Sequence, residues 1–380
     1  MANTLREEHA QEKEDVRSPI SNIISSIAWF ASDQWFMITL LLLILVASQV
    51  QVPSQQQATK ETVIKYATVA VIFLINGCTI STQILVQTLK RWYIHIFVQA
   101  LCFLLTSITT FAVVQATATN QNAIDAALLN GFVLMGCLPT ALSFNTNMTK
   151  KANGNAALTL TESVLGSVMA PAISTVLMTT YSSGNFWYAE ILPQGSTSYG
   201  ALYKKVFQQL GLTLFLPLAV GQLLQYFLPE KTRQAMTTWK GSKLASFALL
   251  ALIWSAYDGA FSADSFATLD TKNIVYLVFV NIGLFLIWIA CALLLSVPWL
   301  SQEDCIAVAF CVPTKTPALG IPLVTIIFEG VSSTDAAKLY IPMIVYQCIQ
   351  TCLASLATIP LKRWQARTAR GSSSSNETIS

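Results

Sequence analysis

Two stretches of the same form, Cys137-Leu138-Pro139-Thr140 and Cys311-Val312-Pro313-Thr314, decide how this chain is interpreted. They begin 311 − 137 = 174 residues apart in a chain of 380 residues. Each interrupts a hydrophobic segment with proline and polar residues, and Pro317 follows the second. Unwound backbone inside a membrane is tolerated only where it is buried in protein or lines a cavity. Broken segments at matching places in two halves therefore indicate the binding site of a secondary transporter.

The composition is that of a membrane protein. Hydrophobic residues make up 54% of the chain and charged residues 11%, whereas a soluble domain has roughly a quarter of its residues charged. The partner indicated is the lipid bilayer, and a net charge of +3 gives no support for nucleic-acid binding. None of the eight cysteines has metal-ligand spacing, so we expect buried free thiols.

The hydrophobic pattern predicts an all-α polytopic membrane protein with ten transmembrane helices, arranged as two inverted five-helix repeats. The predicted spans are 36–52, 62–89, 93–115, 123–151, 156–181, 203–228, 244–261, 273–298, 303–328 and 336–361. Helices 4 and 9 carry the breaks, and Pro217 predicts a kink in helix 6. The predicted divisions are an N-terminal tail (1–32), a first repeat (33–182), an interfacial loop (183–202), a second repeat (203–361) and a C-terminal tail (362–380).

Basic residues predict the orientation. With the N-terminus inside, cytoplasmic segments hold 15 of the 22 Lys and Arg residues and outer segments hold 6, with Lys315 left inside the second break. This bias predicts that both termini are cytoplasmic.

Uncharged oxygen-bearing side chains surround the first break. Ser143, Asn145 and Thr146 follow Pro139 closely, while Thr159 and Ser163 are four residues apart on one face of helix 5. Such groups suit a weakly bound Na⁺ or the polar groups of a substrate. The alternative is hydrogen bonding between helices, which is common for Ser and Thr in membrane bundles.

Two ionisable residues lie within predicted spans, Glu162 in helix 5 and Lys315 in the second break. If the breaks cross, these side chains would approach each other, and such a pair would replace a bound cation or carry a proton. Alternatively, Lys315 snorkels or opposes the C-terminus of a half-helix, and Glu162 faces water. The candidate residues of the second break are Cys311, Thr314, Lys315 and Thr316.

Other polar residues give weaker signals. Asp258, Asp264 and Asp270 lie in or near the predicted helix 7–8 loop, where we expect a solvated surface. His9 lies in the tail and His95 begins helix 3, so no buried histidine pair is expected. The chain contains no hydrolytic, nucleotide-binding or metalloprotease motif, and we do not expect an enzyme.

The residues around both breaks resemble the bile acid:sodium symporter superfamily, solute carrier family 10. The resemblance covers roughly residues 30–365 and implies a panel domain of helices 1, 2, 6 and 7, a core domain of helices 3–5 and 8–10, and crossing of broken helices 4 and 9. The second stretch resembles the member-seven branch, whose fungal relatives are plasma-membrane regulators of calcium homeostasis. The residues that carry it are Gly136-Cys137-Leu138-Pro139, Thr149-Lys150, Gly154-Asn155, Ser163, Gly166-Ser167, Thr314-Lys315-Thr316, Leu319-Gly320-Ile321-Pro322, Phe328 and Gly330.

The resemblance also implies ion-binding positions. Sodium-coupled symporters use polar residues after the first break and on helix 5, where this chain has Asn145, Thr146, Thr159 and Ser163. A second site uses an acidic residue and a glutamine in the second break. Those positions hold Cys311 and Lys315 here. A cationic amine opposes Na⁺ binding, so coupling to two sodium ions is not expected.

The function that we predict from the sequence is that of a multi-pass plasma-membrane protein with a transporter fold. The branch resemblance implies negative regulation of calcium influx, through transport of an unidentified solute and with no cofactor beyond Na⁺. One alternative is a Na⁺- or H⁺-coupled symporter of organic anions that resemble bile acids. Another is a scaffold that does not transport and restrains a calcium channel or its regulators.

Overall fold

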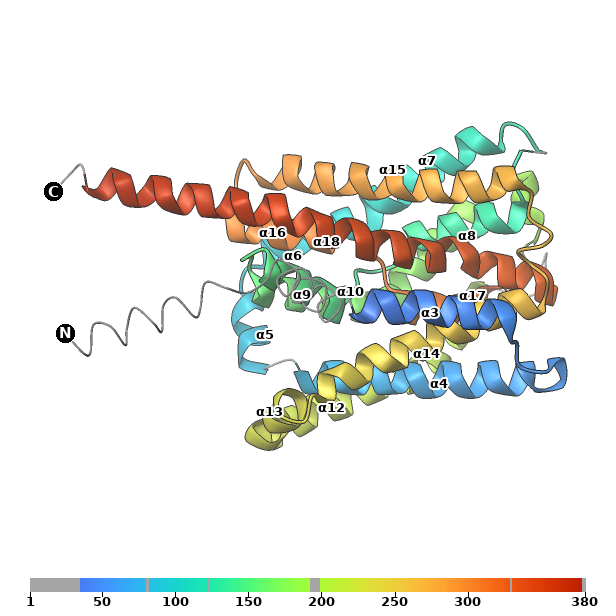
Figure 1. The fold of residues 1–380 in the computed structure, drawn as a ribbon, viewed down its shortest axis with the longest axis horizontal. Helices are drawn as coiled ribbons and strands as arrows, with labels where there is room; N and C mark the ends of the chain where they lie inside the picture. Colours follow the sequence, from blue (N-terminus) through green and yellow to red (C-terminus); the bar gives the residue numbers. More distant parts are fainter. Residues whose placement is uncertain (1–34, 80–81, 122, 192–198, 329, 378–380) are drawn as a thin grey trace, which may run out of the picture.

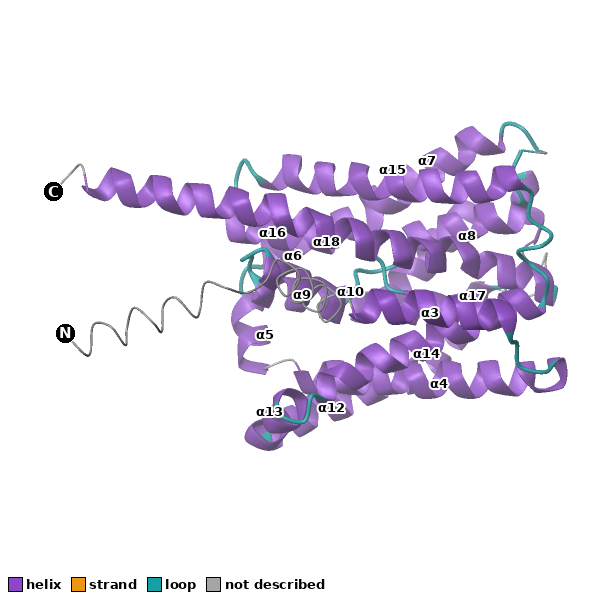
Figure 2. Ribbon diagram, viewed as in Figure 1, coloured by secondary structure: helices purple, strands orange, loops and turns teal. Residues whose placement is uncertain are grey.

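The computed structural model describes residues 35–79, 82–121, 123–191, 199–328 and 330–377. Within these ranges the regular secondary structure is helical (Figure 2), apart from one isolated antiparallel bridge between Thr140 and Lys315. The predicted N-terminal tail, 1–32, lies outside the described residues, as does part of the predicted loop 183–202.

The helices follow the predicted hydrophobic segments. Their bounds are α3 (Trp35–Gln49), α4 (Ser54–Thr79), α5 (Thr82–Leu89), α6 (Trp92–Ala100), η1 (Leu101–Leu105), α7 (Thr106–Ala118), α8 (Ala126–Gly136), α9 (Ser143–Lys151), α10 (Ala156–Ser182), η2 (Trp187–Ile191), α11 (Tyr199–Leu210), η3 (Gly211–Phe215), α12 (Leu216–Phe227), α13 (Pro229–Thr237), α14 (Gly241–Ser262), α15 (Thr271–Ser296), α16 (Gln302–Cys311), α17 (Pro317–Ile327) and α18 (Ser333–Glu377). η1 and η3 are π-turns that continue into the helices on either side.

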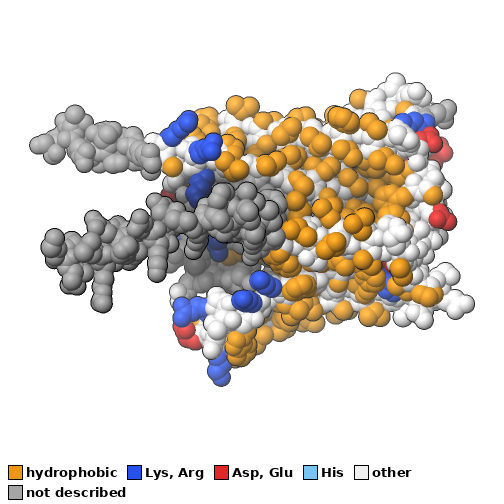
Figure 3. Space-filling model, in the orientation of Figure 1, with side chains coloured by type: hydrophobic (Ala, Val, Ile, Leu, Met, Phe, Trp, Pro, Cys, Tyr) orange, Lys and Arg blue, Asp and Glu red, His pale blue; other side chains and the backbone are white. Residues whose placement is uncertain are grey.

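Seven helical segments of the described chain are long and apolar enough to cross a bilayer. They are 54–79, 92–118, 156–182, 200–227, 243–262, 271–296 and 334–367. Shorter apolar helices are α3, α8 and α17. The chain is therefore a polytopic membrane protein. A belt of hydrophobic side chains crosses the middle of the surface in Figure 3, and Lys and Arg side chains gather at the end of the molecule toward which α18 extends.

The helices pack in two groups (Figure 1). In the first, which we call the small group, α4 packs against α12 and α14, and α14 also packs against α3. In the second, which we call the large group, α8 packs against α7 and α18, α15 against α16 and α18, and α10 against α9 and α16. Contacts of α14 with α18 and of α4 with α17 join the two groups.

Two glycines allow close helix packing in the small group. A Cβ atom on Gly77 of α4 would lie 2.4 Å from the Leu218 carbonyl, and one on Gly221 of α12 would lie 2.3 Å from the Leu74 carbonyl. These distances are shorter than a van der Waals contact, so only glycine fits at this crossing. Small residues let membrane helices approach closely in this way.

Three helix predictions differ from the structure. The predicted span 62–89 is two helices, and α4 begins at Ser54, directly after Pro53. The last helix runs to Glu377 rather than 361. Residues 362–370 contain neither proline nor glycine, so the helix continues through them. The predicted kink at Pro217 takes the form of η3, just before it; proline has no N–H to donate to the carbonyl of Thr213.

Candidate functional site

The two interrupted helices meet at their breaks. α8 ends at Gly136 and α9 begins at Ser143, so Pro139 lies in the connection. α16 ends at Cys311 and α17 begins at Pro317, so Pro313 lies in the second connection. The connections run antiparallel where Thr140 pairs with Lys315, and the Thr316 N–H donates to the Pro139 carbonyl over 3.2 Å. Segments 174 residues apart thus cross at the centre of the fold.

Three buried side chains join the crossed breaks. The Asn145 amide donates to the Thr140 hydroxyl, and the Thr314 hydroxyl donates to Asn145 Oδ1 over 2.5 Å. The Thr140 and Thr314 hydroxyls lie 3.3 Å apart. Asn145 and Thr314 are fully buried. Two residues predicted from opposite breaks, Asn145 and Thr314, are therefore in direct contact.

The other oxygen-bearing candidates of the first break hydrogen-bond within the large group. The Thr146 hydroxyl donates to the Leu142 carbonyl over 3.1 Å, and the Ser163 hydroxyl lies 3.2 Å from the Ala141 carbonyl. Ser143 begins α9, and its side chain lies outside the described part of the structure. Thus Ser163 of α10 contacts the backbone of the first break.

Thr159 lies next to this cluster. Its hydroxyl is fully buried, 3.0 Å from that of Thr149 in α9, and the Ser163 hydroxyl donates to its carbonyl over 2.8 Å. Cys311 is also fully buried, and its thiol neighbours Thr159 and Thr140. Cys311 therefore brings the end of α16 into contact with the first break.

Lys315 is nearly fully buried, and its ammonium points at η1, the start of α7 and the first break. Nζ donates to the Cys102 carbonyl (2.7 Å), the Thr106 hydroxyl (2.8 Å) and the Leu138 carbonyl (2.9 Å). The prediction that Lys315 pairs with Glu162 is wrong, because the Lys315 ammonium donates its hydrogen bonds to these three oxygens instead. Snorkelling is excluded too, since the side chain is directed inward.

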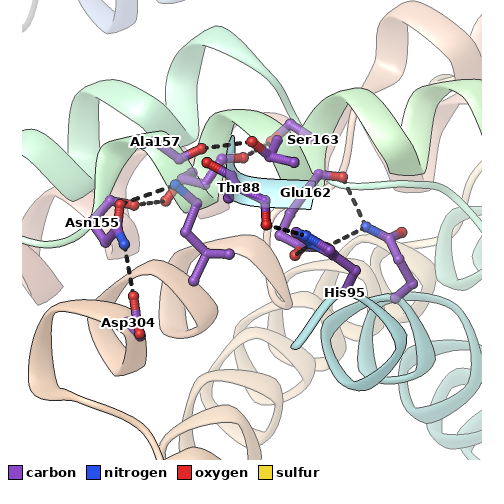
Figure 4. Close-up of polar contacts among 11 residues, drawn as sticks. Thr88, His95, Asn155, Ala157, Glu162, Ser163 and Asp304 are labelled. Atoms are coloured by element: carbon purple, nitrogen blue, oxygen red, sulfur yellow. Dashed lines mark hydrogen bonds and ion pairs between the residues drawn. The ribbon is translucent and has the colours of Figure 1, made fainter. Parts of the chain in front are cut away.

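Glu162 contacts α6 instead (Figure 4). Its carboxylate contacts His95 Nδ1 and accepts from the Gln99 amide over 2.8 Å. The Glu162 side chain has no solvent exposure, so the water-facing alternative is wrong. His95 Nε2 lies 2.9 Å from the Thr88 carbonyl and therefore carries a proton. Sequence reasoning missed this contact, although His95 and Gln99 have the i, i+4 spacing of one helix face.

A second polar cluster holds together the starts of three helices. Arg91, just before α6, donates to Asp304 of α16 over 2.6 Å, and the Asn155 amide donates to the other Asp304 oxygen over 2.7 Å. Asn155 also caps α10 by accepting from the Leu158 N–H over 3.1 Å. The hydrogen bond that Arg91 donates to Asp304 raises the pKa of Arg91. Apart from the helix-start pattern, no feature of the sequence predicts this cluster.

Asp258 corrects another prediction. It lies on α14, is fully buried, and accepts from Lys60 Nζ (2.5 Å), the Gln57 amide (2.8 Å) and the Val52 N–H (3.0 Å). The solvated-surface prediction is wrong because Asp258 faces α4, where Gln57 and Lys60 donate to its carboxylate. This carboxylate therefore fixes the packing of the small group.

A cavity of about 470 Å³ lies between the two helix groups and reaches the crossed breaks. Thr140 and Thr316 line it from the breaks, and Asn76 lines it from α4. Much of the remaining lining is apolar, and three lysines add positive charge. The lysines are Lys150, Lys151 and Lys243.

Crossed broken helices beside a cavity, in a polytopic helical chain, define the class of secondary transporters. The sequence profile of the SBF-like CPA transporter family matches residues 34–363, so the chain belongs to this family. The resemblance found from the two breaks is thereby confirmed.

Named relatives agree with this membership. Solute carrier RCH1 of Candida albicans is 31% identical over 374 residues, covering 90% of this chain and 91% of the relative. Solute carrier RCH1 of Saccharomyces cerevisiae is 29% identical over 385 residues, covering 92% and 88%. Sodium/bile acid cotransporter 7 of Danio rerio is 27% identical over 309 residues, covering 80% and 86%. These relatives are named as carriers and cotransporters, not as enzymes.

Proposed function

We propose that this protein is a plasma-membrane transporter that moves a solute through the cavity between its two helix groups, and that this transport lowers calcium influx. The observation that carries the proposal is the position of the cavity, which joins the small group to the crossed breaks. A solute bound there contacts both groups, so movement of one group against the other changes the side from which the cavity is reached. The resemblance to fungal regulators of calcium homeostasis supports the calcium part.

The proposed membrane arrangement has ten crossings in two inverted repeats. The seven long helical segments, α3 and the two interrupted helices supply them. The small group, α3, α4, α11–α12 and α14, corresponds to the panel domain, and the remaining helices correspond to the core domain. The basic end in Figure 3, toward which α18 extends, supports a cytoplasmic C-terminus, because cytoplasmic segments of membrane proteins carry an excess of Lys and Arg. An even number of crossings then puts the N-terminus on the same side of the membrane.

A sodium site at the first break remains part of the proposal. Asn145, Thr146, Thr159 and Ser163 bring amide and hydroxyl oxygens to one buried region. Na⁺ would replace several of the hydrogen bonds that now join these groups. Replacing Na⁺ by N-methyl-D-glucamine in an uptake assay on reconstituted protein tests this part, and uptake that does not change would contradict it.

An organic anion is the second candidate for the solute. The lining of the cavity combines apolar side chains with Lys150, Lys151 and Lys243, which would attract a negatively charged amphipathic molecule. The names of the vertebrate relatives, sodium/bile acid cotransporters, are compatible with such a solute. Uptake of a labelled bile acid into vesicles with the reconstituted protein, and its reduction by unlabelled bile acids, tests this candidate.

Filling the cavity tests whether transport is required. Ser246 of α14 lines the cavity, so Ser246→Trp should block it. The matched control is Leu294→Trp on α15, where the side chain is 73% exposed on the lipid-facing surface. The readout is cytosolic calcium after external calcium addition, in cells that lack the gene and carry each variant.

We expect cells without the protein to show a larger calcium rise, the control variant to restore the wild-type response, and Ser246→Trp to fail at equal surface level. An equal response in cells with and without the protein would contradict the calcium role. Full complementation by Ser246→Trp would instead favour the scaffold that restrains a channel.

A further inference from the structure

Lys315 Nζ has the surroundings of a bound cation. Three oxygens lie 2.7–2.9 Å away, the carbonyls of Cys102 and Leu138 and the hydroxyl of Thr106. The ring of Trp288, which is fully buried, faces the same atom with its centroid 5.4 Å distant. Carbonyl and hydroxyl oxygens together with an aromatic face are favourable surroundings for a cation.

The hydrogen-bond pattern fits the charged form of the side chain. Two of the three acceptors are carbonyls, which cannot donate. The Thr106 hydroxyl is within reach of the carbonyls of Cys102 (2.6 Å) and Gly136 (2.8 Å), so its proton is directed to one of them. Three acceptors therefore take three N–H groups, which only the ammonium supplies.

The oxygens are positioned by irregular backbone. Cys102 lies in η1, where the Thr106 N–H donates to the Leu101 and Phe103 carbonyls, so the Cys102 carbonyl is left to side-chain donors such as Lys315. Leu138 lies in the first break. Regular helices would keep such carbonyls in their own hydrogen-bond ladders. The π-turn η1 and the first break thus each supply a carbonyl oxygen to the Lys315 ammonium.

The second break is held so that Lys315 can reach this point. The Lys315 N–H donates to Gln350 Oε1 over 2.7 Å, and the Gln350 amide donates back to the Lys315 carbonyl over 2.8 Å. The Gln350 side chain of α18 therefore pairs with the backbone of Lys315 as a neighbouring β-strand would. The Tyr346 hydroxyl also donates to the Pro313 carbonyl.

We propose that the Lys315 ammonium is a tethered cation that fills a site suited to a free monovalent cation, and that shortening the side chain opens this site to a small ammonium or alkali-metal ion. The site joins the η1–α7 segment, the first break and the second break. In the native protein it is permanently occupied, so no exchangeable cation binds there. The inference rests on the geometry of Lys315 and not on the proposed transport.

The test compares Lys315→Ala with Lys315→Met by thermal unfolding of the purified protein. Alanine removes the ammonium and leaves room for an ion, whereas methionine removes the charge and fills most of the space. The probes are methylammonium chloride and NaCl, against N-methyl-D-glucamine chloride at equal ionic strength. Lys338→Ala is the control, since Lys338 bonds a carboxylate, Asp125, over 2.7 Å rather than a set of neutral oxygens.

We expect the Tm of Lys315→Ala to rise by roughly 2–4 °C, saturating with methylammonium or Na⁺ concentration. The same ions should leave Lys315→Met and Lys338→Ala unchanged, apart from any sodium shift that the wild type shares. Equal responses of the Ala and Met variants at position 315 would overturn the proposal.

A second set of variants covers failure of Lys315→Ala to fold. Thr106→Val removes one acceptor, and Thr106→Ser keeps it. We expect Thr106→Val to lower Tm when Lys315 is present but to have little further effect in the Lys315→Met background, while Thr106→Ser stays near wild type. Equal losses from Thr106→Val in both backgrounds would overturn the proposal.

Discussion

At the scale of single residues, Glu162 is a carboxylate with no solvent exposure, in contact with His95 and Gln99. A carboxylate in such a position is stable only when its partners offset the loss of hydration. Gln99 also donates to the Glu162 carbonyl over 2.8 Å, so one amide ties α6 to both the backbone and the side chain of this residue. The contact fixes α6 against α10, beside the crossed breaks.

Removing His95 should therefore cost more than removing the pair. We expect His95→Ala to lower the free energy of unfolding by about 3–5 kcal/mol, because it leaves the buried carboxylate without its main partner. The double variant His95→Ala/Glu162→Gln should recover part of this loss, because the remaining amide is neutral and still bonds Gln99. Urea-induced unfolding in detergent micelles measures the free energy of unfolding of the single and the double variant. A double variant less stable than His95→Ala would contradict the pairing.

The sequence identified which residues are unusual at this scale but not their partners. Glu162 and Lys315 are recognisable because ionisable groups inside a span are costly. Their partners depend on side-chain direction and on helix irregularity. Lys315 binds the Cys102 carbonyl, which the π-turn η1 makes available, and no sequence pattern marks that turn. Asp258 lay within the predicted span, near its end, and was expected to face water; its side chain instead packs inward, a direction that the sequence does not specify.

At the scale of helices, the crossing of α4 and α12 depends on Gly77 and Gly221. Gly221→Leu should destabilise the protein by roughly 3 kcal/mol, because its Cβ collides with the backbone of α4 and the helices must separate. Gly283→Ala in α15 is the matched control, since no atom lies within 4 Å of its added Cβ. Alanine there should stabilise the helix by about 0.5–1 kcal/mol. Thermal unfolding compares the two, and similar effects would contradict the close-packing account.

Hydrophobic runs and proline positions were enough to place most helices, but not all of their ends. The start of α4 and the last turns of α18 lie in polar sequence that is compatible with either helix or loop. Their helical state follows from neighbouring residues rather than from an apolar pattern. The crossing of the breaks was implied by the resemblance, while the bridge between Thr140 and Lys315 came from the structure.

At the scale of the whole molecule, the account requires the small group to move against the large group. α3 of the small group meets α18 of the large group, where Met37 Sδ lies 3.3 Å from Cys352 Sγ. Met37 also lines the cavity. A covalent link between these positions would hold the groups in the arrangement described here, and transport would stop.

Reversible crosslinking of Met37→Cys to Cys352 tests whether this movement is needed for calcium control. Cells that carry only this variant are treated with a short bifunctional thiol reagent, and cytosolic calcium is recorded after external calcium addition. The control is Met37→Cys/Cys352→Ala, which cannot form the link. The account predicts that calcium control is lost when the link forms, returns after reduction with dithiothreitol, and is unaffected in the control. Undiminished calcium control in cells whose protein is shown by mass spectrometry to be fully linked would contradict it.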